Sequence, residues 1–329
     1  MKLSIVIICW NDLRVIGNCL HSIYSSACSS EFEVIVSDNG STDGSVDFIR
    51  ENYPNAHVLQ NGANLGFAKG NNAGIRESHG QYVLILNPDT IVHESSLDKL
   101  VEFADRHPQT GAFGCRVLNP DGSYQVSARL FPTIWRYWLA ALYLRRLASI
   151  SNVFAADMYP GWRGDTERAV DWQSGCCVMF RGDLLKELGG FDEQFFYHFE
   201  EVDLCRRVRN AGYSILFTPG ATITHLGGQS VGRFPIQFAI ERYRSRYKYF
   251  YKHYGARGLR HCRWFSLVSI RIRQAGYGLI GFFKPSVPIH KRLEMYRAVA
   301  RWNKVLDPIR FVERGEEPDL DHQTVLQHS

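Results

Sequence analysis

Residues 81–92 read Gln-Tyr-Val-Leu-Ile-Leu-Asn-Pro-Asp-Thr-Ile-Val, and this stretch decides the fold. Tyr82 to Leu86 is a short, uninterrupted apolar run, which predicts a strand buried on both faces. The Asn-Pro pair ends that strand, because proline lacks a ladder donor. Asp89 therefore follows the carboxyl end of a central strand, where α/β sheets bind ligands and where a carboxylate can hold a divalent cation against phosphates. The alternative is that Asp89 and Thr90 only form a turn.

The sequence around this stretch alternates short β-branched runs with helical stretches, as βαβ units do. Strands are expected at 3–8, 33–37, 57–60, 82–86 and 112–117, and helices near 13–26, 45–52, 67–78 and 95–106. This order predicts an α/β domain with a mostly parallel sheet flanked by helices. Its functional edge should lie at the carboxyl ends of the strands.

Polar and small residues follow each of the first three strands, at 9–12, 37–44 and 61–66. Such residues are ordinary in turns, but their recurrence after successive strands favours a nucleotide site. Asp38 can accept a hydrogen bond from a base imide, and loop amides at a helix start can face phosphate. The loops contain neither Gly-x-Gly-x-x-Gly nor a P-loop motif, so a dinucleotide fold and a P-loop NTPase are disfavoured. The candidate nucleotide residues in these loops are Cys9, Trp10, Asn11, Asp38, Asn64 and Gly66.

A second group of chemically capable residues lies between 172 and 230. Glu200, Glu201 and Asp203 open a predicted helix, where acids also suit the helix dipole. The aromatic run before them, 195–199, would desolvate a carboxylate and raise its pKa toward the range useful for a general base. Trp172 and Gly175 are candidate acceptor-binding residues upstream of it. His225 ends a later apolar run beside Gly227-Gly228-Gln229-Ser230, and it is either a ligand or a structural histidine.

The composition is that of an ordinary globular protein. The eight cysteines lack metal-finger spacing, so Cys176 and Cys177 are expected to pack in a core. A reducing compartment is therefore expected. The first apolar run is too short for a secretory leader. Residues 134–150 are helical and rich in Trp, Tyr and Leu, which suits a lid, a packing helix or a membrane-touching element. Residues 159–171 are expected to form a mobile loop.

The C-terminal part is strongly basic. Residues 233–310 contain eighteen Lys and Arg against three acids, about +15, so the remainder of this chain of net charge +5 sums to about −10. Basic and aromatic residues alternate over 234–254. Residues 264–283 are apolar enough to suggest a membrane segment, but Arg271 and Arg273 in its middle are costly in a bilayer core. An interfacial helix on an anionic membrane surface is therefore preferred over plain helical packing, and no nucleic acid is expected as a partner. The tail from 313 onward is expected to be disordered.

Taken together, the motifs resemble those of inverting family 2 glycosyltransferases, and most of all their bacterial rhamnosyltransferase branch. The resemblance covers residues 3–255 and rests on the segments 38–45, 64–72, 86–90, 189–204 and 225–230. It implies a GT-A (Rossmann-like) fold, a nucleoside-diphosphate sugar, Mg²⁺ or Mn²⁺, and a carboxylate base. Lys69 and Asn87 join the donor-binding residues through these motifs.

By motif position, Asp38 resembles the base-recognising residue, Asp89 the metal-holding acid, Glu201 the catalytic base and His225 a diphosphate or metal contact. Asn87 stands where many members have the first Asp of Asp-x-Asp, and Glu201 replaces the more usual Asp of a Glu-Asp pair. The second departure leaves the choice of base open between Glu200 and Glu201. A processive synthase is disfavoured because residues 229–234 do not match Gln-x-x-Arg-Trp.

The sequence hypothesis is thus a metal-dependent, inverting transfer of one sugar, most simply L-rhamnose from dTDP-rhamnose, to a lipid-linked saccharide in cell-wall or O-antigen synthesis. The alternatives are another donor such as UDP-galactofuranose, and a catalytically silent nucleotide-sugar-binding scaffold. We expect a GT-A domain at 1–230 (nucleotide half 1–118, acceptor half 119–230), a membrane-associating helical region at 231–312 and a tail at 313–329. The partners are a polyprenyl-diphosphate-linked acceptor and the inner membrane surface, with the protein cytoplasmic and peripheral on the membrane's inner face.

Overall fold

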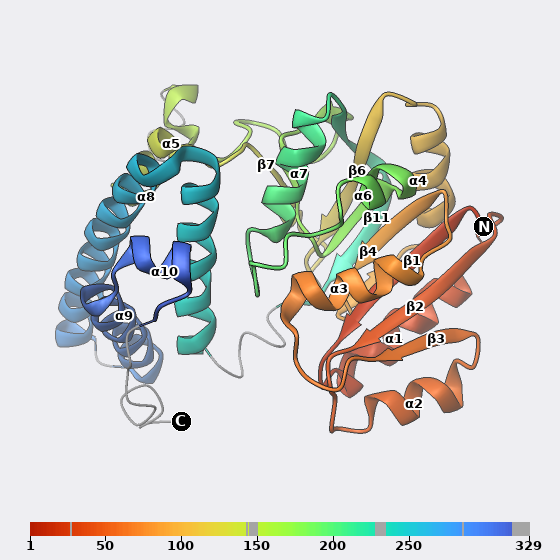
Figure 1. Ribbon diagram of the computed structural model, residues 1–329, viewed down its shortest axis with the longest axis horizontal. Coiled ribbons are helices and arrows are strands. Elements are labelled where there is room, and N and C mark those ends of the chain that lie inside the picture. Colours follow the sequence, from red (N-terminus) through yellow and green to blue (C-terminus); the bar gives the residue numbers. More distant parts are fainter. Residues whose placement is uncertain (27, 143, 145–150, 228–234, 285, 318–329) are drawn as a thin grey trace. The chain divides into compact units, whose positions relative to one another are not determined.

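A computed structural model describes residues 1–26, 28–142, 144, 151–227, 235–284 and 286–317 (Figure 1). The chain divides into two compact units. The first comprises 1–131, 161–196 and 200–229, and the second comprises 132–160, 197–199 and 230–329. In this division 132–160 groups with the helical unit, whereas the sequence assigned it to the acceptor half; the expected domain boundaries stay a prediction. Part of the expected helix 134–150, and all of the 228–234 and 318–329 stretches, lie outside the described residues.

The first unit is built on a mixed sheet with a parallel core. In the described residues its strand order is β3-β2-β1-β4-β10-β6-β11-β5, with β8 beside β11, and β7 pairs with β9 in a separate ribbon. The strands are β1 (Leu3–Cys9), β2 (Phe32–Asp38), β3 (Ala56–Gln60), β4 (Tyr82–Leu86), β5 (Thr90–Val92), β6 (Thr110–Leu118), β7 (Ala128–Arg129), β8 (Arg168–Ala169), β9 (Trp172–Gln173), β10 (Cys177–Arg181) and β11 (Ser214–His225). The helices are α1 (Leu13–Ser25), α2 (Ser45–Asn52), α3 (Gly66–Glu77), α4 (Ser96–Asp105), α6 (Gly182–Glu187) and α7 (Glu200–Asn210).

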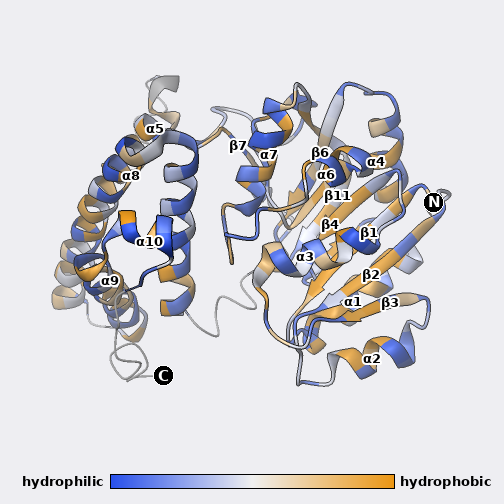
Figure 2. Ribbon diagram, in the orientation of Figure 1, coloured by the Kyte–Doolittle hydropathy of each residue, from blue (hydrophilic) through white to orange (hydrophobic). Residues whose placement is uncertain are grey.

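The strand predicted at 82–86 is confirmed as β4, and every residue in it is buried. It pairs in parallel with β1 and antiparallel with β10, so apolar side chains are needed on both of its faces. Figure 2 shows this apolar centre in orange. The other four predicted strands and the four predicted helices of 1–118 are also present, with ends within two residues of expectation. The α/β fold with a mostly parallel central sheet is therefore as predicted.

The strand ends are brought to one edge by this topology. β1, β2 and β4 run parallel, with Cys9 opposite Asp38 in the β1–β2 register. β5 follows β4 after a turn and pairs antiparallel with β11, which places His225 opposite Thr90. The segment that follows β4 therefore reaches the end of β11, and the polar segments after β1 and β2 lie at the same edge of the sheet.

The second unit is helical. It contains α5 (Ile134–Ala141), the short 3-10 helix η2 (Asn152–Ala155), α8 (Pro235–Phe283), α9 (Val287–Val305) and α10 (Pro308–Arg314). Gly255 has φ 64° and ψ −167°, which interrupts α8, and Figure 1 shows the chain turning there so that the two segments of α8 lie side by side. Glycine adopts this conformation without a Cβ penalty.

The aromatic residues of 234–254 mostly pack inside this unit. Tyr247, Tyr249 and Phe250 are fully buried. They therefore form a core and are not a membrane-facing stripe, which corrects that part of the expectation. None of the helices in the described ranges has a stretch both long and apolar enough to span a bilayer.

Candidate active site

Asp89 and His225 contact each other at the edge of the sheet. The sequence marked each of them as a candidate ligand but did not predict their contact. Asp89 Oδ1 lies 3.2 Å from His225 Nε2, and both side chains are largely buried. The Asp89 carbonyl oxygen also accepts a hydrogen bond from the Leu226 amide at 2.9 Å. A carboxylate and an imidazole nitrogen thus face each other just beyond β4 and β11, where a divalent ion or a diphosphate can be held.

Gln125 orients the His225 ring, and sequence reasoning missed it. Its Oε1 lies 2.7 Å from His225 Nδ1, while its Nε2 donates to Asn119 Oδ1 at 2.8 Å. The Asn119 amide in turn donates to Ser123 Oγ at 2.9 Å, which sets both amide orientations. Since Oε1 can only accept, Nδ1 carries the proton and the Nε2 lone pair faces Asp89 when the ring is neutral. This is the arrangement in which a second residue fixes a metal-ligating histidine.

Asn87, two residues before Asp89, is a further candidate oxygen ligand. Its amide N–H donates to the Cys176 carbonyl at 3.0 Å, and its own carbonyl accepts from Thr90 Oγ1 at 2.7 Å. Its side-chain Oδ1 is buried and has no hydrogen-bond partner in the described part of the chain. A buried acceptor left open in this way needs a ligand, since leaving it unsatisfied costs about 1–3 kcal/mol.

These donors fit a hard divalent cation that shares its coordination with a substrate. Within the described ranges, no group of three or more His, Cys, Asp and Glu could enclose an ion. Asp89, His225 and Asn87 offer two oxygens and one nitrogen, which leaves positions for diphosphate oxygens and water, as Mg²⁺ and Mn²⁺ sites in phosphate-handling enzymes have.

The loop after β2 is held by its own aspartate. Asp38 is buried, and its carboxylate accepts from the amides of Gly40 and Ser41 at 3.1–3.2 Å. The Asn11 amide Oδ1 accepts from Thr42 N at 2.7 Å, which ties this loop to the one after β1. These bonds preform the loop, and they use acceptor positions of Asp38 that a base would otherwise occupy.

Other predicted nucleotide residues differ in what they can offer. Cys9 is fully buried and its carbonyl accepts from Asn39 N at 2.8 Å, so its thiol belongs to the core and not to the rim. Trp10 is half-buried, and its amide donates to Asp12 at 2.9 Å. Lys69 is exposed on α3.

An asparagine network joins the second and third loops. Asn39 Nδ2 donates to the Gly66 carbonyl at 3.1 Å and Asn61 Nδ2 donates to Asn39 Oδ1 at 3.0 Å. Asn64 Oδ1 accepts from the Gly66 amide at 3.0 Å. Asn39 and Asn61 were not among the predicted site residues; each lies in a predicted polar loop, but only their mutual contact distinguishes them from turn residues.

Gly66 also ties α3 to the turn before α7. It has φ +81°, and a Cβ there would lie 2.5 Å from the Phe196 carbonyl oxygen. The neighbouring Phe67 amide donates to that same oxygen at 2.7 Å. Asn72, one turn later, exchanges hydrogen bonds of 2.8 Å with the Phe191 backbone. The 189–196 turn is thereby fastened to the nucleotide loops.

The three acids at the start of α7 have different environments. Asp203 is fully buried and its Oδ2 accepts from Arg207 Nε at 2.8 Å. Arg207 also donates to the carbonyls of Leu188 and Gly190, so this pair holds the helix to the preceding turn. Glu200 is buried, whereas Glu201 is partly exposed.

Glu201 lies beside the predicted acceptor residue Gly175. A Cβ on Gly175 would be 3.7 Å from the Glu201 Cβ. The Trp172 indole N–H donates to the Leu130 carbonyl at 3.0 Å, which fixes this side chain at the start of the same segment. Burial raises the pKa of the Cys176 thiol to about 12, and the charges of both Asp89 and Glu201 add to the increase. The segment 172–177 therefore lies between the Asp89 region and the Glu201 region.

Comparisons with known proteins identify the family of this chain. The family model described as glycosyl transferase family 2 matches residues 4–161. An N-acetylglucosaminyl-diphospho-decaprenol L-rhamnosyltransferase of Mycobacterium tuberculosis is 33% identical over 237 residues, which cover 68% of this chain and 76% of the relative. The chain belongs to glycosyltransferase family 2. Within the family it is also similar to the rhamnosyltransferase WbbL of Escherichia coli, at 23% identity over 61% of this chain and 75% of that protein.

Solved structures show the same GT-A fold. A mannosyltransferase from Pyrobaculum calidifontis, in complex with GDP-Man and Mn²⁺, matches with a TM-score of 0.57 at 16% identity over 96% of this chain and 88% of that one. TarS residues 1–349 of S. aureus, in complex with UDP-GlcNAc, matches with a TM-score of 0.51 at 18% identity over 91% and 82%. The predicted family and its rhamnosyltransferase-like character are confirmed, and the chain is a glycosyltransferase.

Proposed function

We propose that this glycosyltransferase moves L-rhamnose from dTDP-L-rhamnose to a polyprenyl-diphosphate-linked saccharide in cell-wall or O-antigen synthesis, with inversion at the anomeric carbon. The observation that carries the proposal is the pairing of Asp89 with His225 in the same unit as a partly exposed Glu201 beside Gly175. The transferred sugar and the acceptor follow the name of the M. tuberculosis relative, and dTDP as the nucleotide follows the sequence hypothesis.

The reaction needs a base on the acceptor side of the sugar and a binding site for the leaving diphosphate on the opposite side. A hydroxyl oxygen of the acceptor attacks the anomeric carbon, the new C–O bond forms on one face of the sugar, and the bond to the diphosphate breaks on the other face. The acceptor proton passes to a carboxylate, and the bonding electrons leave with the nucleoside diphosphate. One displacement of this kind inverts the configuration.

Glu201 is the base in this proposal. A base must reach a bound hydroxyl, and Glu201 is partly exposed beside the acceptor segment, whereas Glu200 is buried. We assign Asp203 a structural role in this proposal. Its carboxylate binds Arg207, and Arg207 also donates to the carbonyls of Leu188 and Gly190, which links α7 to the preceding turn.

Asp89, His225 and Asn87 would hold Mg²⁺ or Mn²⁺ together with the donor diphosphate. When bound, the cation offsets the negative charge that develops on the leaving diphosphate. Gln125 keeps the His225 Nε2 lone pair directed toward Asp89. The preformed loops at Asp38 and Gly66 flank the same sheet edge and would hold the nucleoside.

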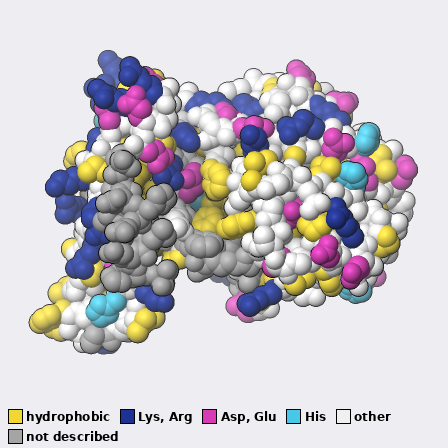
Figure 3. All heavy atoms as spheres, turned by 60° about the horizontal axis from the view of Figure 1, so that its bottom comes forward, with side chains coloured by type: hydrophobic (Ala, Val, Ile, Leu, Met, Phe, Trp, Pro, Cys, Tyr) yellow, Lys and Arg dark blue, Asp and Glu magenta, His cyan; other side chains and the backbone are white. Residues whose placement is uncertain are grey.

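The membrane part of the proposal rests on one end of the helical unit, where α8 ends and α9 begins. Large apolar side chains are exposed there, including Phe282 at 80% and Phe283 at 71%. Leu279, Ile280 and Val287 are exposed beside them, and Lys284, Lys291 and Arg292 are exposed around them. Figure 3 shows apolar side chains in yellow at one end of this unit and basic side chains in dark blue along it. Exposed aromatic and basic residues together suit the headgroup layer of an anionic membrane, at the cytoplasmic face where a lipid-linked acceptor is found.

A transfer assay with a panel of donors tests the proposal. Wild type should transfer rhamnose from dTDP-rhamnose to a lipid-diphosphate GlcNAc acceptor, and a chelator should abolish the transfer. Glu201→Gln should lose transfer by at least about 10²-fold while retaining donor binding, because general base catalysis contributes that much. Glu200→Gln is the matched control and should retain most activity. Transfer from UDP-galactofuranose alone would replace the donor, and undiminished transfer by Glu201→Gln would refute the assignment of the base.

A further inference from the structure

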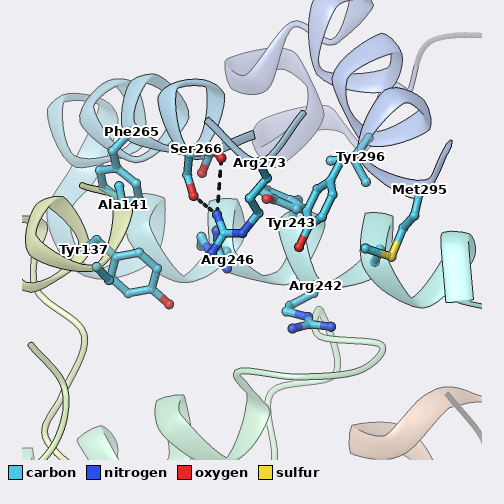
Figure 4. Close-up of a pocket in the computed structure, with 14 residues that line it drawn as sticks. Tyr137, Ala141, Arg242, Tyr243, Arg246, Phe265, Ser266, Arg273, Met295 and Tyr296 are labelled. Atoms are coloured by element: carbon cyan, nitrogen blue, oxygen red, sulfur yellow. Dashed lines mark hydrogen bonds between the residues drawn. The ribbon is translucent and has the colours of Figure 1, made fainter. Parts of the chain in front are cut away.

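The helical unit contains a cavity that the proposed transfer chemistry has not used (Figure 4). Its volume is about 160 Å³, and it lies between α5, both segments of α8, and α9. Three arginines line it: Arg242 and Arg246 from the first segment of α8, and Arg273 from the second. Not one Asp or Glu is among the described residues that line it.

The first two arginines lie on one helix face and have no acid to neutralise them. Residues four apart on a helix are neighbours. Arg242 and Arg246 form no ion pair with any described residue, and the Arg246 Nε is buried with no acceptor in the described ranges. The nearest acid in sequence, Glu241, is paired with Arg244 at 3.1 Å. Two like charges on neighbouring positions of one helix face repel each other, and a bound anion would offset that repulsion.

Aromatic rings preorganise this charge. The Arg246 guanidinium lies 5.0 Å from the Tyr137 ring centroid and 4.7 Å from that of Tyr243. Arg273 is fixed by hydrogen bonds to Ser269 and lies 5.7 Å from the Tyr296 ring. Stacked guanidinium groups retain their charge and present fixed N–H donors, which is the geometry that recognises phosphate.

The electrostatic surroundings agree with an unneutralised site. Burial lowers the pKa of Arg242, and the charge of Arg246 lowers it further. The groups that raise the pKa of Arg246 are chiefly tyrosines, with Tyr137 first, and not carboxylates. The pKa of the His198 imidazole falls to about 3, through burial first and then through Arg242 and Arg246.

We propose that this cavity binds the diphosphate group of the lipid-linked acceptor, a use that rests on the proposed function. Two or three guanidinium groups match a dianionic diphosphate diester, and the apolar part of the lining, Phe265, Met295 and Val299, suits the first carbons of a lipid chain. Arg242 and Arg246 are the phosphate ligands, and Arg273 completes the positive side of the cavity.

Calorimetric titration with inorganic diphosphate tests the site without any transfer reaction. Losing a charge-assisted hydrogen bond should weaken diphosphate binding by about 10- to 100-fold in Arg246→Gln. Arg242→Gln should show the same loss, and its exposed side chain can be removed without disturbing the core. The control is Arg271→Gln, an equal charge change at an exposed position of α8 that does not line this cavity. Equal binding by Arg242→Gln and Arg271→Gln would overturn the site, whether or not the protein transfers rhamnose.

Steady-state kinetics then identify the source of the phosphate. With an acceptor that carries the diphosphate, Arg242→Gln should raise the acceptor KM about tenfold or more and leave the donor KM unchanged. With an alkyl GlcNAc acceptor that lacks phosphate, the variant and the wild type should behave alike. Equal loss with both acceptors would refute diphosphate recognition. Loss of binding to phosphatidylglycerol vesicles with no change in acceptor KM would assign the site to a phospholipid headgroup and overturn the acceptor assignment.

Discussion

Gln125→Leu is the substitution that most directly tests whether His225 is a metal ligand. It removes the Oε1 acceptor that lies 2.7 Å from His225 Nδ1 and retains a side chain of similar volume. The ring then loses the contact that sets its tautomer and rotation, and a partly buried Nδ1–H is left without its acceptor. The lost hydrogen bond and the unsatisfied donor together are worth about 1.5–3 kcal/mol. That range agrees with the 10- to 100-fold loss of metal affinity typical when the residue orienting a ligating histidine is removed.

Electron paramagnetic resonance of free Mn²⁺, titrated with protein and saturating dTDP, measures this affinity without an acceptor. The expected result is a Kd for Mn²⁺ about 10- to 100-fold higher in Gln125→Leu than in wild type. Two controls narrow the cause. Gln125→Glu retains an acceptor for Nδ1 and should stay close to wild type, and Asn119→Ala removes only the contact to Gln125 Nε2 and should have a smaller effect. A folded Gln125→Leu variant with unchanged Mn²⁺ affinity would refute His225 as a ligand.

Three further predictions concern stability. Asp203→Ala leaves Arg207 without its buried partner and should cost about 3 kcal/mol, lowering Tm by about 6–12 °C; adding Arg207→Leu should recover part of that loss, and an additive double variant would contradict the pairing. Gly66→Ala meets a backbone oxygen at 2.5 Å, whereas Gly62→Ala at φ +75° meets nothing, so denaturant unfolding should show a cost about 1–3 kcal/mol larger at Gly66. His198 has a folded-state pKa of about 3, below its unfolded value of about 6.5, so the protein loses stability as pH falls below 6.5, by about 2 kcal/mol at pH 5. His198→Asn should flatten this dependence, because asparagine tolerates the φ of +68° at this position, and parallel pH profiles would exclude the histidine as the cause.

The parts of the site that the sequence predicts are those set by local chemistry. A five-residue apolar run ended by Asn-Pro reads as a buried strand and a turn, so the place of Asp89 follows from residues 81–92 alone. Polar loops after successive parallel strands must share one sheet edge, so the meeting of these loops at one edge was also predictable. Cys176 and Cys177 are both buried, as their spacing indicated.

Contacts between distant segments were not predictable in the same way. His225 faces Asp89 because β11 runs antiparallel to β5, a pairing across more than a hundred residues that no periodicity encodes. Gln125 has no distinguishing motif, and its role appears only through its contact with that histidine. Glu200, Glu201 and Asp203 share one short acidic run, which does not show that Glu200 and Asp203 are buried while Glu201 is partly exposed.

In the C-terminal region the sequence pattern was clear, but it fitted two different structures. Aromatic side chains serve a helical core and a membrane surface equally well, so the alternation over 234–254 cannot distinguish the two. Packing buries Tyr247 and Phe250 and leaves Phe282 and Phe283 exposed.

The sequence by itself determined the α/β class and the order and nearly the ends of nine of the first ten elements, with β5 missed, because strand burial, turn chemistry and helix periodicity act over a few residues. Only the tertiary structure decided that Asp89 pairs with His225, that Glu201 is the least buried of the three acids at the start of α7, and that three arginines line one cavity. Those outcomes depend on which segments, distant in the sequence, pack against each other and bury their surfaces, and a local pattern does not carry that information.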